Sequence, residues 1–295
     1  MMRKYRLWKS SSKFLWLMLC IFLFSISVAY ASNEGADGGN TWTRVNIGLV
    51  DLTVKDLFIN PLNPTAIYAA TWDGIFKSIN GGESWMNIGL SGLEVRNFFT
   101  IDFTVVTAGT SGGTYMSTDG GGSWTKINDT PFPRSFHSPV YVIDPIAPTT
   151  AYMGTRHRGV RRSTDGENTW TEVNTGFTGM LRIYSLAMDP ITPTTLYAGT
   201  YQDGVFKTTN GGDSWTQVNN GLTDLTIYTL AIDPITPTTL YAGTWDGIFK
   251  TTNGGKSWMN IGLTDLEVIK IVIDPLNPTT IYTVTDGGVF KLSVE

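Results

Sequence analysis

The chain has 295 residues, of which 41% are hydrophobic and 16% are charged, enough apolar surface for at least one globular core. Five of the 21 basic residues lie within the first 13 positions, which leaves 16 basic and 25 acidic side chains, a net charge of −9, for the remainder. This acidic balance excludes general nucleic-acid binding, which needs a basic surface. Cys20 is the only cysteine, so the chain has no disulfide of its own and no thiol chemistry beyond residue 20.

The N-terminus has the pattern of an export signal. A basic start is followed by an apolar run over residues 14–28 and by Ala29-Tyr30-Ala31, the small-x-small pattern that signal peptidase recognises. An uncleaved anchor is the alternative, but the run is shorter than the about 20 residues of a membrane span. We therefore predict a signal peptide at 1–31, a lead-in at 32–40, an exported protein that is periplasmic or extracellular, and no membrane span after cleavage.

An Ile-Asp-Pro phrase and its close variants recur along the rest of the chain. The Asp or Asn of this phrase lies at Asn60, Asp102, Asp144, Asp189, Asp233 and Asp274, with steps of 42, 42, 45, 44 and 41 residues. Each repeat contains only short β-rich runs, as in the fifth, where they cover residues 226–232, 239–244, 248–251 and 257–261. Four short strands in a period near 44 residues are typical of a β-propeller blade.

A second repeated phrase runs from Ser78 to Trp85 and reads Ser-Ile-Asn-Gly-Gly-Glu-Ser-Trp. The Asp or Asn at its third position can accept hydrogen bonds from turn N–H groups, and its tryptophan can be buried between sheets. Glu167 replaces a glycine in the third copy, which predicts a distorted turn there. Because a residue that recurs in five copies is a poor catalytic candidate, we expect structural roles for Asp37, Asn80, Asp119, Asp165, Asn210, Asn253, Trp42, Trp85, Trp124, Trp170, Trp215 and Trp258.

This phrase is similar to the Asp-box, S/T-x-D/N-x-G-x-S/T-W, of sialidase-like and sortilin-like propellers (BNR repeats). It also resembles the repeats of photosystem II assembly factors and of some secreted glycoside hydrolases. The resemblance covers nearly the whole chain after residue 31, and it implies an all-β propeller fold.

The two ends of the repeat array complement each other. The chain ends after a third strand, residues 288–293, whereas residues 37–42 supply a partial Asp-box and residues 41–46 a further strand. Pairing these segments would leave no open sheet edge. We therefore predict a single all-β domain, a six-bladed β-propeller over residues 41–295 in which the N-terminal strand closes the last blade.

One face of the predicted disc carries a basic island on the third blade. Antiparallel strands place the turns between second and third strands on the same face as the blade-to-blade loops, where propeller ligands usually bind. The candidates there are Arg134, His137, Arg156, His157 and Arg158, with Arg182 of the next blade as a further candidate. Arginine pairs well with anionic groups, so we predict an anionic ligand or acidic partner. The alternative is a solvated loop whose arginine stems cover apolar surface.

Three aromatic residues in equivalent turns of the same face are further candidates: Trp72, Tyr201 and Trp245. Aromatic side chains in such turns stack on sugar rings or anchor a protein partner. Their recurrence also fits simple packing against neighbouring loops.

Catalytic patterns are weak throughout the sequence. Sialidase chemistry needs an arginine triad and a tyrosine–glutamate pair, and no glutamate looks like a unique partner for a tyrosine. The aspartates expected on the ligand face adjoin glycine or turns, which indicates turn capping. No metal-ligand spacing, nucleophile elbow or phosphate loop occurs, so we expect no metal and no cofactor. We therefore predict a monomeric, non-catalytic scaffold for a protein or glycan partner; a carbohydrate-active enzyme such as a glycoside hydrolase, and a surface-structural protein, stay as alternatives.

Overall fold

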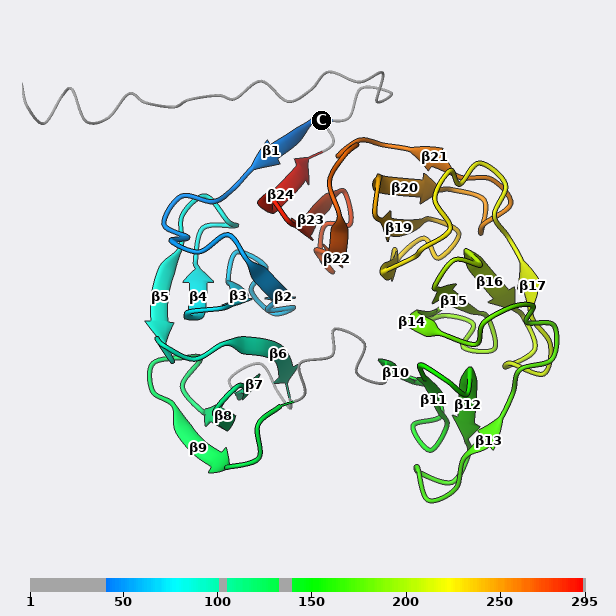
Figure 1. Cartoon of the computed structure of the whole chain (residues 1–295), viewed down its shortest axis with the longest axis horizontal. Coiled ribbons are helices and arrows are strands. Elements are labelled where there is room, and N and C mark those ends of the chain that lie inside the picture. The colour runs from blue at the N-terminus through cyan, green and yellow to red at the C-terminus, as the bar shows by residue number, and fades with distance from the viewer. Residues whose placement is uncertain (1–40, 101–104, 133–139, 294–295) are drawn as a thin grey trace, which may run out of the picture. The chain divides into compact units, whose positions relative to one another are not determined.

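The computed structural model describes residues 41–100, 105–132 and 140–293. They form 24 strands and no helix, as the sequence predicts, and they all lie within the unit Gly35–Glu295. The strands make six four-stranded antiparallel sheets, which follow one another around a common centre (Figure 1). These sheets are the blades of a six-bladed β-propeller, so the predicted fold and number of blades are confirmed. The export signal and Asp37 lie outside the described residues.

We number the blades in chain order. Blade 1 contains β2 (Val54–Ile59), β3 (Ile67–Thr71), β4 (Gly74–Ser78) and β5 (Met86–Gly89); blade 2 contains β6 (Val95–Thr100), β7 (Val106–Thr110), β8 (Gly113–Ser117) and β9 (Thr125–Asn128). Blade 3 contains β10 (Val140–Ile143), β11 (Ala151–Gly154), β12 (Val160–Ser163) and β13 (Thr171–Glu172); blade 4 contains β14 (Ile183–Met188), β15 (Leu196–Thr200), β16 (Val205–Thr208) and β17 (Thr216–Gln217). Blade 5 contains β18 (Thr229–Ile232), β19 (Leu240–Thr244), β20 (Gly247–Thr251) and β21 (Met259–Asn260); blade 6 contains β22 (Val268–Ile273), β23 (Thr280–Thr285), β24 (Gly288–Ser293) and β1 (Trp42–Arg44).

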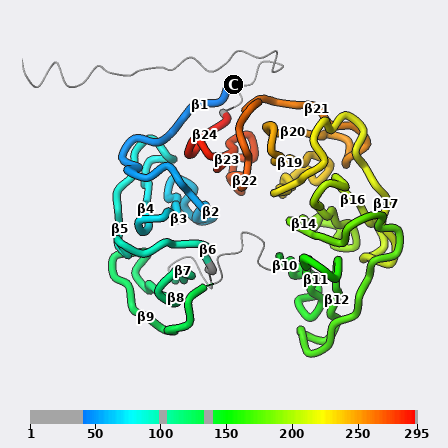
Figure 2. The backbone as a smooth tube through the Cα atoms, in the orientation of Figure 1, coloured from blue at the N-terminus to red at the C-terminus, as the bar shows by residue number. Residues whose placement is uncertain are grey.

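The chain ends meet in blade 6. Strand β1 pairs antiparallel with β24, with Trp42 opposite Leu292 and Arg44 opposite Phe290. Val45 donates its N–H to the Val289 carbonyl at 2.9 Å, which extends this pairing by one residue. The predicted closure by an N-terminal strand is therefore confirmed. Figure 2 shows β1 lying alongside β24 at the outer side of this blade.

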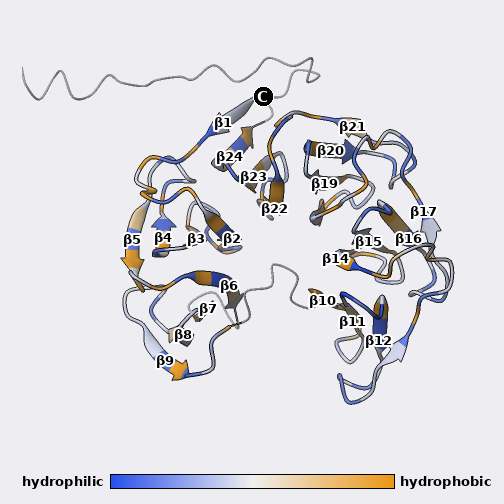
Figure 3. Cartoon of the chain, in the orientation of Figure 1, coloured by the Kyte–Doolittle hydropathy of each residue, from blue (hydrophilic) through white to orange (hydrophobic). Residues whose placement is uncertain are grey.

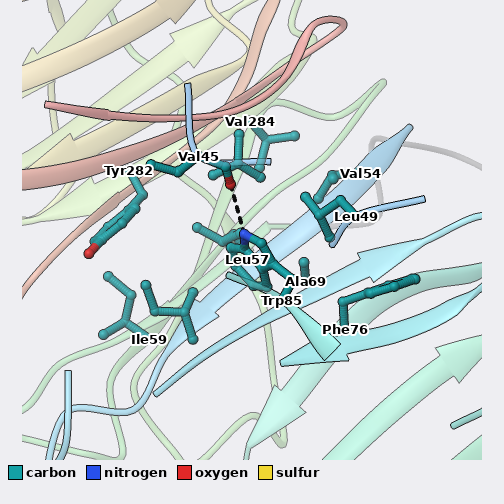
Figure 4. Close-up of a cluster of buried hydrophobic side chains, with 12 residues drawn as sticks. Val45, Leu49, Val54, Leu57, Ile59, Ala69, Phe76, Trp85, Tyr282 and Val284 are labelled. Carbon is teal, nitrogen blue, oxygen red and sulfur yellow. Dashed lines mark hydrogen bonds between the residues drawn. The ribbon is translucent and has the colours of Figure 1, made fainter. Parts of the chain in front are cut away.

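Apolar side chains fill the spaces between neighbouring blades. Inner strands such as β2 and β22 lie nearest the centre, and both carry hydrophobic residues (Figure 3). Between blades 6 and 1, the buried cluster includes Val284, Leu57, Ile59 and Trp85 (Figure 4). Burying one such aliphatic side chain contributes about 1.5–3 kcal/mol, so contacts between blades supply much of the stability.

Each of the five Asp-boxes that the structure describes forms one turn with the same hydrogen bonds. In blade 1, the Asn80 side-chain oxygen accepts the Ser84 N–H at 3.0 Å, and the Ser78 hydroxyl oxygen accepts the Gly82 N–H at 2.8 Å. The third copy keeps this arrangement, because Glu167 adopts a φ of 67° and donates its N–H to Ser163 Oγ at 2.9 Å. The distorted turn predicted there is wrong. The glutamate instead takes a backbone conformation that favours glycine.

A tyrosine and a cation fasten four of the five described boxes to the preceding blade. Tyr68 Oη and Lys77 Nζ both donate to the carbonyl of Gly120 in the next box, at 3.0 and 2.8 Å. The Lys77 ammonium also lies 4.9 Å from the centre of the Tyr68 ring. We call this pair and its acceptor carbonyl the Tyr–Lys clamp. It recurs with Tyr197 and Lys207, which donate to the Gly254 carbonyl.

Candidate functional site

The loops of one face of the propeller are joined by backbone hydrogen bonds. In blades 1, 3, 4 and 5, a glycine of the turn between second and third strand donates to a leucine carbonyl in the following blade-to-blade loop, as Gly204 does to Leu225 at 2.8 Å. We call this side the upper face. It carries Trp72, Tyr201, Trp245 and the Arg156–Arg158 turn, so the faces predicted for these residues hold. The Asp-boxes lie on the opposite, lower face.

A shallow depression of about 600 Å³ lies on the upper face between blades 4 and 5. Its lining comes from the turns of both blades and the loop between them: Tyr201, Gln202, Thr223, Asp224, Leu225, Thr226, Tyr228, Trp245 and Asp246. Trp245 leaves 61% of its surface exposed, although it is a large aromatic side chain. We call this depression the aromatic pocket, because Tyr201, Tyr228 and Trp245 are among its lining residues.

A layer of tyrosines supports the pocket from blade 4. The rings of Tyr184 and Tyr228 are nearly parallel, at 12°, with centroids 6.0 Å apart. Tyr184 also packs against Tyr201 at 5.6 Å. The guanidinium of Arg182 lies 5.3 Å from the centre of the Tyr201 ring, a cation–π contact. These contacts hold the rings in place, which lowers the entropy cost of binding a ligand against them.

Charge changes sign from one side of the pocket to the other. Burial raises the pKa of the Tyr184 phenol. The positive charges of Arg156 and Arg182 oppose this shift but are the smaller effect. On the other side, burial raises the pKa of Tyr228 to about 12, and Glu267 adds to this through its charge and a hydrogen bond. Burial, followed by the charge of Asp286, raises the pKa of the Glu267 carboxyl. The aromatic pocket thus lies between two arginines and a partly buried acid.

The aspartates of the upper face accept hydrogen bonds from backbone N–H groups of their own and neighbouring loops. Asp224 accepts the Thr226 N–H at 2.8 Å with one oxygen and the Trp245 N–H at 2.9 Å with the other. Asp246 accepts the Asp265 N–H at 2.9 Å. These bonds fix the loops, as turn capping predicts. They also leave these carboxylates poorly placed to act as general acids or nucleophiles.

The basic island of blade 3 is only partly within the described residues. Arg156, His157 and Arg158 are exposed in the turn between β11 and β12, where the Arg158 N–H donates to Thr155 Oγ at 2.9 Å. Arg134 and His137 lie outside the described residues. Arg156 and Arg182 both lie close enough to Tyr184 for their charges to affect its phenol. The sequence grouped Arg182 with the basic island and did not predict its position beside the aromatic pocket.

Trp72 lies apart from the other two aromatic candidates. It belongs to blade 1, is 46% exposed, and has the Lys55 ammonium 5.2 Å from its ring centre. Burial lowers the pKa of Lys55, against the attraction of Glu94, Asp51 and Glu267. The candidates thus divide into a pair that shares a pocket, Tyr201 and Trp245, and a single tryptophan covered by a lysine.

Sequence reasoning missed Tyr184 and Tyr228. Each is the second residue after a blade-to-blade loop, and the equivalent positions hold Lys55, Arg96 and Ile269. This variation among repeats was the signal that could have identified them, since residues shared by all blades are structural. Among the described residues, no cluster of His, Cys, Asp and Glu could hold a metal ion. The same part of the chain contains no helix able to cross a membrane.

A family profile and several solved propellers are similar to this chain. The profile Sortilin-Vps10 (Sortilin, neurotensin receptor 3) matches residues 112–236. The extracellular domain of the putative hybrid two-component system BT4673 from B. thetaiotaomicron has a TM-score of 0.64 at 15% identity, covering 87% of this chain and 40% of that one. YCF48 bound to D1 peptide has a TM-score of 0.56 at 13% identity, covering 86% of this chain and 97% of that one. These likenesses confirm the predicted resemblance to Asp-box propellers and show the fold.

Glycoside hydrolases with longer chains are also similar. An ancestral GH74 enzyme has a TM-score of 0.47 at 22% identity, and this chain covers 36% of it; the GH74 xyloglucanase from Xanthomonas campestris has a TM-score of 0.47 at 15% identity, with 53% of it covered. Our chain, covered to 82% and 85% in these comparisons, therefore spans between a third and about half of those enzymes. No match was found among curated proteins.

Proposed function

We propose that this protein is an exported, non-catalytic propeller that binds a protein partner through the aromatic pocket of its upper face. The observation that carries the proposal is the meeting of Tyr201, Tyr228 and Trp245 in one depression of about 600 Å³. Exposed tryptophan and tyrosine held in fixed positions are the residues that dominate binding energy in protein interfaces.

The charges around the pocket favour a polypeptide over a neutral ligand. Arg182 stacks on Tyr201, and Arg156 lies on the same side, so an acidic side chain of the partner has two guanidinium groups to pair with. Arginine, tyrosine and tryptophan together are the composition of interface hot spots. The similar propeller YCF48, which is described as bound to D1 peptide, supports this ligand class. His157 and Arg158, in the same turn as Arg156, would extend the basic side.

The upper-face carboxylates support a non-catalytic role. Hydrolysis of a glycoside uses two carboxylates about 5–10 Å apart across a cleft. Asp224 uses both of its oxygens to hold backbone N–H groups. Glu267 pairs with the phenol of Tyr228, whose pKa of about 12 keeps it protonated and unsuited to nucleophilic attack at neutral pH. Export follows from the basic and apolar N-terminus, and we expect the propeller to act as a monomer.

Binding of the purified full chain to two panels of ligands tests this proposal. One is a library of peptides displayed on phage, and the other is a set of soluble xyloglucan, xylan and β-glucan. We expect peptides with an acidic residue near an aromatic or aliphatic one to be selected. Trp245→Ala should weaken their binding at least tenfold, or about 1.4 kcal/mol.

Trp72→Ala is the matched control, because this tryptophan occupies the equivalent turn of blade 1 outside the pocket. It should leave the affinity for the selected peptides within about twofold. Binding to a polysaccharide but to no peptide would favour the glycan alternative, and release of reducing sugar would favour a hydrolase. Equal losses in the two variants would contradict the assignment of the pocket.

A further inference from the structure

The interface between blades 2 and 3 lacks the clamp that joins other blades. The clamp tyrosine and its cation are cross-strand neighbours, and at these positions blade 2 has Thr107 opposite Met116. Neither side chain can reproduce the two hydrogen bonds that Tyr152 and Arg162 make from blade 3 to the Gly211 carbonyl, at 3.0 and 2.8 Å. Thr107 Oγ is instead buried without a hydrogen-bond partner.

The glycine whose carbonyl would accept the clamp's hydrogen bonds, Gly166, also lacks close contacts. A Cβ atom built on the box glycine Gly166 would meet nothing within 4 Å. At Gly81, Gly120 and Gly211, the same atom would meet the clamp tyrosine's oxygen at 3.4, 3.4 and 3.1 Å. Gly166 is exposed, whereas Gly81 and Gly211 are buried. In the described part of the chain, Gly166 thus has no neighbour at the position where the equivalent glycines of the other four boxes meet the clamp.

The box tryptophan of blade 3 also lacks its usual bond. In blades 1, 2, 4, 5 and 6, the indole N–H donates to a carbonyl of the preceding blade, as Trp215 does to Val173 at 2.9 Å. Within the described residues, Trp170 has no such bond. Its ring contacts Tyr141 of its own blade edge-on, with centroids 6.0 Å apart.

The first strand of blade 3, β10, exposes apolar side chains toward blade 2. Tyr141 is 50% exposed, whereas Leu57, Leu186 and Ile271 at the equivalent positions are 3, 8 and 4% exposed. Ile143 is 53% exposed, against 8% for Met188. On the facing side, Ile127 of blade 2 is 52% exposed, although Val173 of blade 3, at the same position of its own repeat, is buried.

A loop residue makes the contact that a strand makes elsewhere. Phe132 donates its N–H to the Thr110 carbonyl at 2.8 Å, in the way that Ile183 donates to Thr155 and Ile227 to Thr200. Its ring also fills the space beside Gly109 that Ile227 fills beside Gly199. Since Phe132 precedes the first strand of blade 3 by several residues, its contact fastens the connecting loop to blade 2.

We propose that the interface between blades 2 and 3 is a seam at which the propeller ring opens and closes while its other interfaces stay shut. In a repeat architecture each interface contributes separately to stability, so the interface with the fewest contacts opens first. Tyr141 and Ile143 are exposed at the seam as the structure has it, and closing against blade 2 buries them together with Trp170. Arg156, Arg182 and the aromatic pocket all lie on the blade 3 to blade 5 side of the seam, so the inference is independent of the proposed ligand.

Thiol labelling tests the seam, because the chain has one cysteine, Cys20, which Cys20→Ser removes. In that background of the full chain, Tyr141→Cys is compared with Leu186→Cys, its equivalent in blade 4, using a maleimide under native conditions. Tyr141→Cys should label at least about tenfold faster. The pair Ile143→Cys and Met188→Cys repeats the comparison if either first variant fails to fold.

Rebuilding the clamp should close the seam. Thr107→Tyr with Met116→Lys supplies the two donors for the Gly166 carbonyl, and it should slow labelling at position 141 about tenfold without changing the rate at position 186. Equal labelling at positions 141 and 186 in the unmodified ring would overturn the proposal. So would a rebuilt clamp that leaves the rate at position 141 unchanged.

Discussion

Blades 1 and 5 present almost the same sequence in different surroundings. Residues 71–90 and 244–263 differ at only three of 20 positions, and both include a Thr-Trp-Asp-Gly turn. Trp72 nevertheless lies beneath a lysine, whereas Trp245 lines a pocket with Tyr201 and Tyr228. The difference comes from two other segments. At the start of the same blade Lys55 stands in the position of Tyr228, and in the preceding blade Asp286 stands in the position of Tyr201. A repeat therefore determines its own fold, and its neighbours determine what its exposed residues can bind.

The largest effects should fall equally on both blades, at the box tryptophans. Trp85 and Trp258 are 6 and 5% exposed, and each donates its indole N–H to a carbonyl of the preceding blade, at 2.7 and 2.8 Å. We expect Trp85→Ala and Trp258→Ala each to lower the free energy of unfolding by about 3–5 kcal/mol. Urea denaturation followed by circular dichroism measures this.

The exposed tryptophans of the same two blades provide the contrast. Trp72→Ala and Trp245→Ala should change the free energy of unfolding by less than about 0.5 kcal/mol, because both side chains are on the surface, 46% and 61% exposed, and outside the buried core. A loss at Trp245 as large as that at Trp258 would mean that the pocket tryptophan is part of the core.

Exchanging the residue that lies beside each exposed tryptophan should distinguish the two blades more clearly, because it changes peptide binding. Tyr228→Lys places in the pocket the residue that covers Trp72, removes the stack on Tyr184, and brings a cation next to Trp245. We expect the peptides selected on the unmodified protein to bind at least about tenfold more weakly. Isothermal titration calorimetry measures the change.

Lys55→Tyr is the reciprocal variant and should gain no peptide binding. Blade 6 has Asp286 in its second turn, where blade 4 has Tyr201, so one new tyrosine cannot rebuild the pocket on blade 1. Peptide binding acquired through Lys55→Tyr would show that the tyrosine at this position is sufficient, and that the neighbouring blade matters less than we argue.

The parts of the molecule that repeat could be predicted from the sequence, and the parts that differ could be predicted only in outline. The spacing of Asp189, Asp233 and Asp274 indicated four-stranded blades, and the unpaired strand at Trp42 indicated closure, because both depend on local pattern and edge pairing. The aromatic pocket depends on which rings of three separate segments meet. Tyr201 and Trp245 were found by their turn, whereas Tyr184 and Tyr228 lie at strand starts, where aromatic residues usually indicate packing.

The sequence also contains the signal for the weak interface between blades 2 and 3, since Thr107 and Met116 occupy the positions where other blades have tyrosine and a cation. It could not be recognised before the clamp was seen, because its donors and acceptor belong to different blades. At Glu167 the sequence instead predicted a feature that the structure does not have. It suggested a distorted turn, but the hydrogen bonds of the turn hold the glutamate at positive φ.

A small, pH-dependent effect is expected at the acid beside the pocket, Glu267. Because burial raises its pKa in the folded state, the protonated form is favoured by folding. Its contribution to stability is therefore fully present below the pKa of the unfolded chain, about 4.3, and is lost as the pH rises through the folded pKa. Glu267→Gln should remove this dependence and make the protein more stable near neutral pH. Since the side chain is only partly buried, solvent screening limits the gain to under about 1 kcal/mol.

Urea denaturation between pH 3.5 and pH 8, in steps of about half a unit, compares the two proteins through the pH range in which carboxyl groups titrate. The matched variant is Glu94→Gln, at the equivalent position of blade 2, where Arg96 pairs with the carboxylate at 2.6 Å. Removing that partner should lower stability near neutral pH, because it leaves Arg96 partly buried without its charge partner. If both variants shifted stability in the same direction, the surroundings of these two glutamates would not differ in the way that the structure indicates.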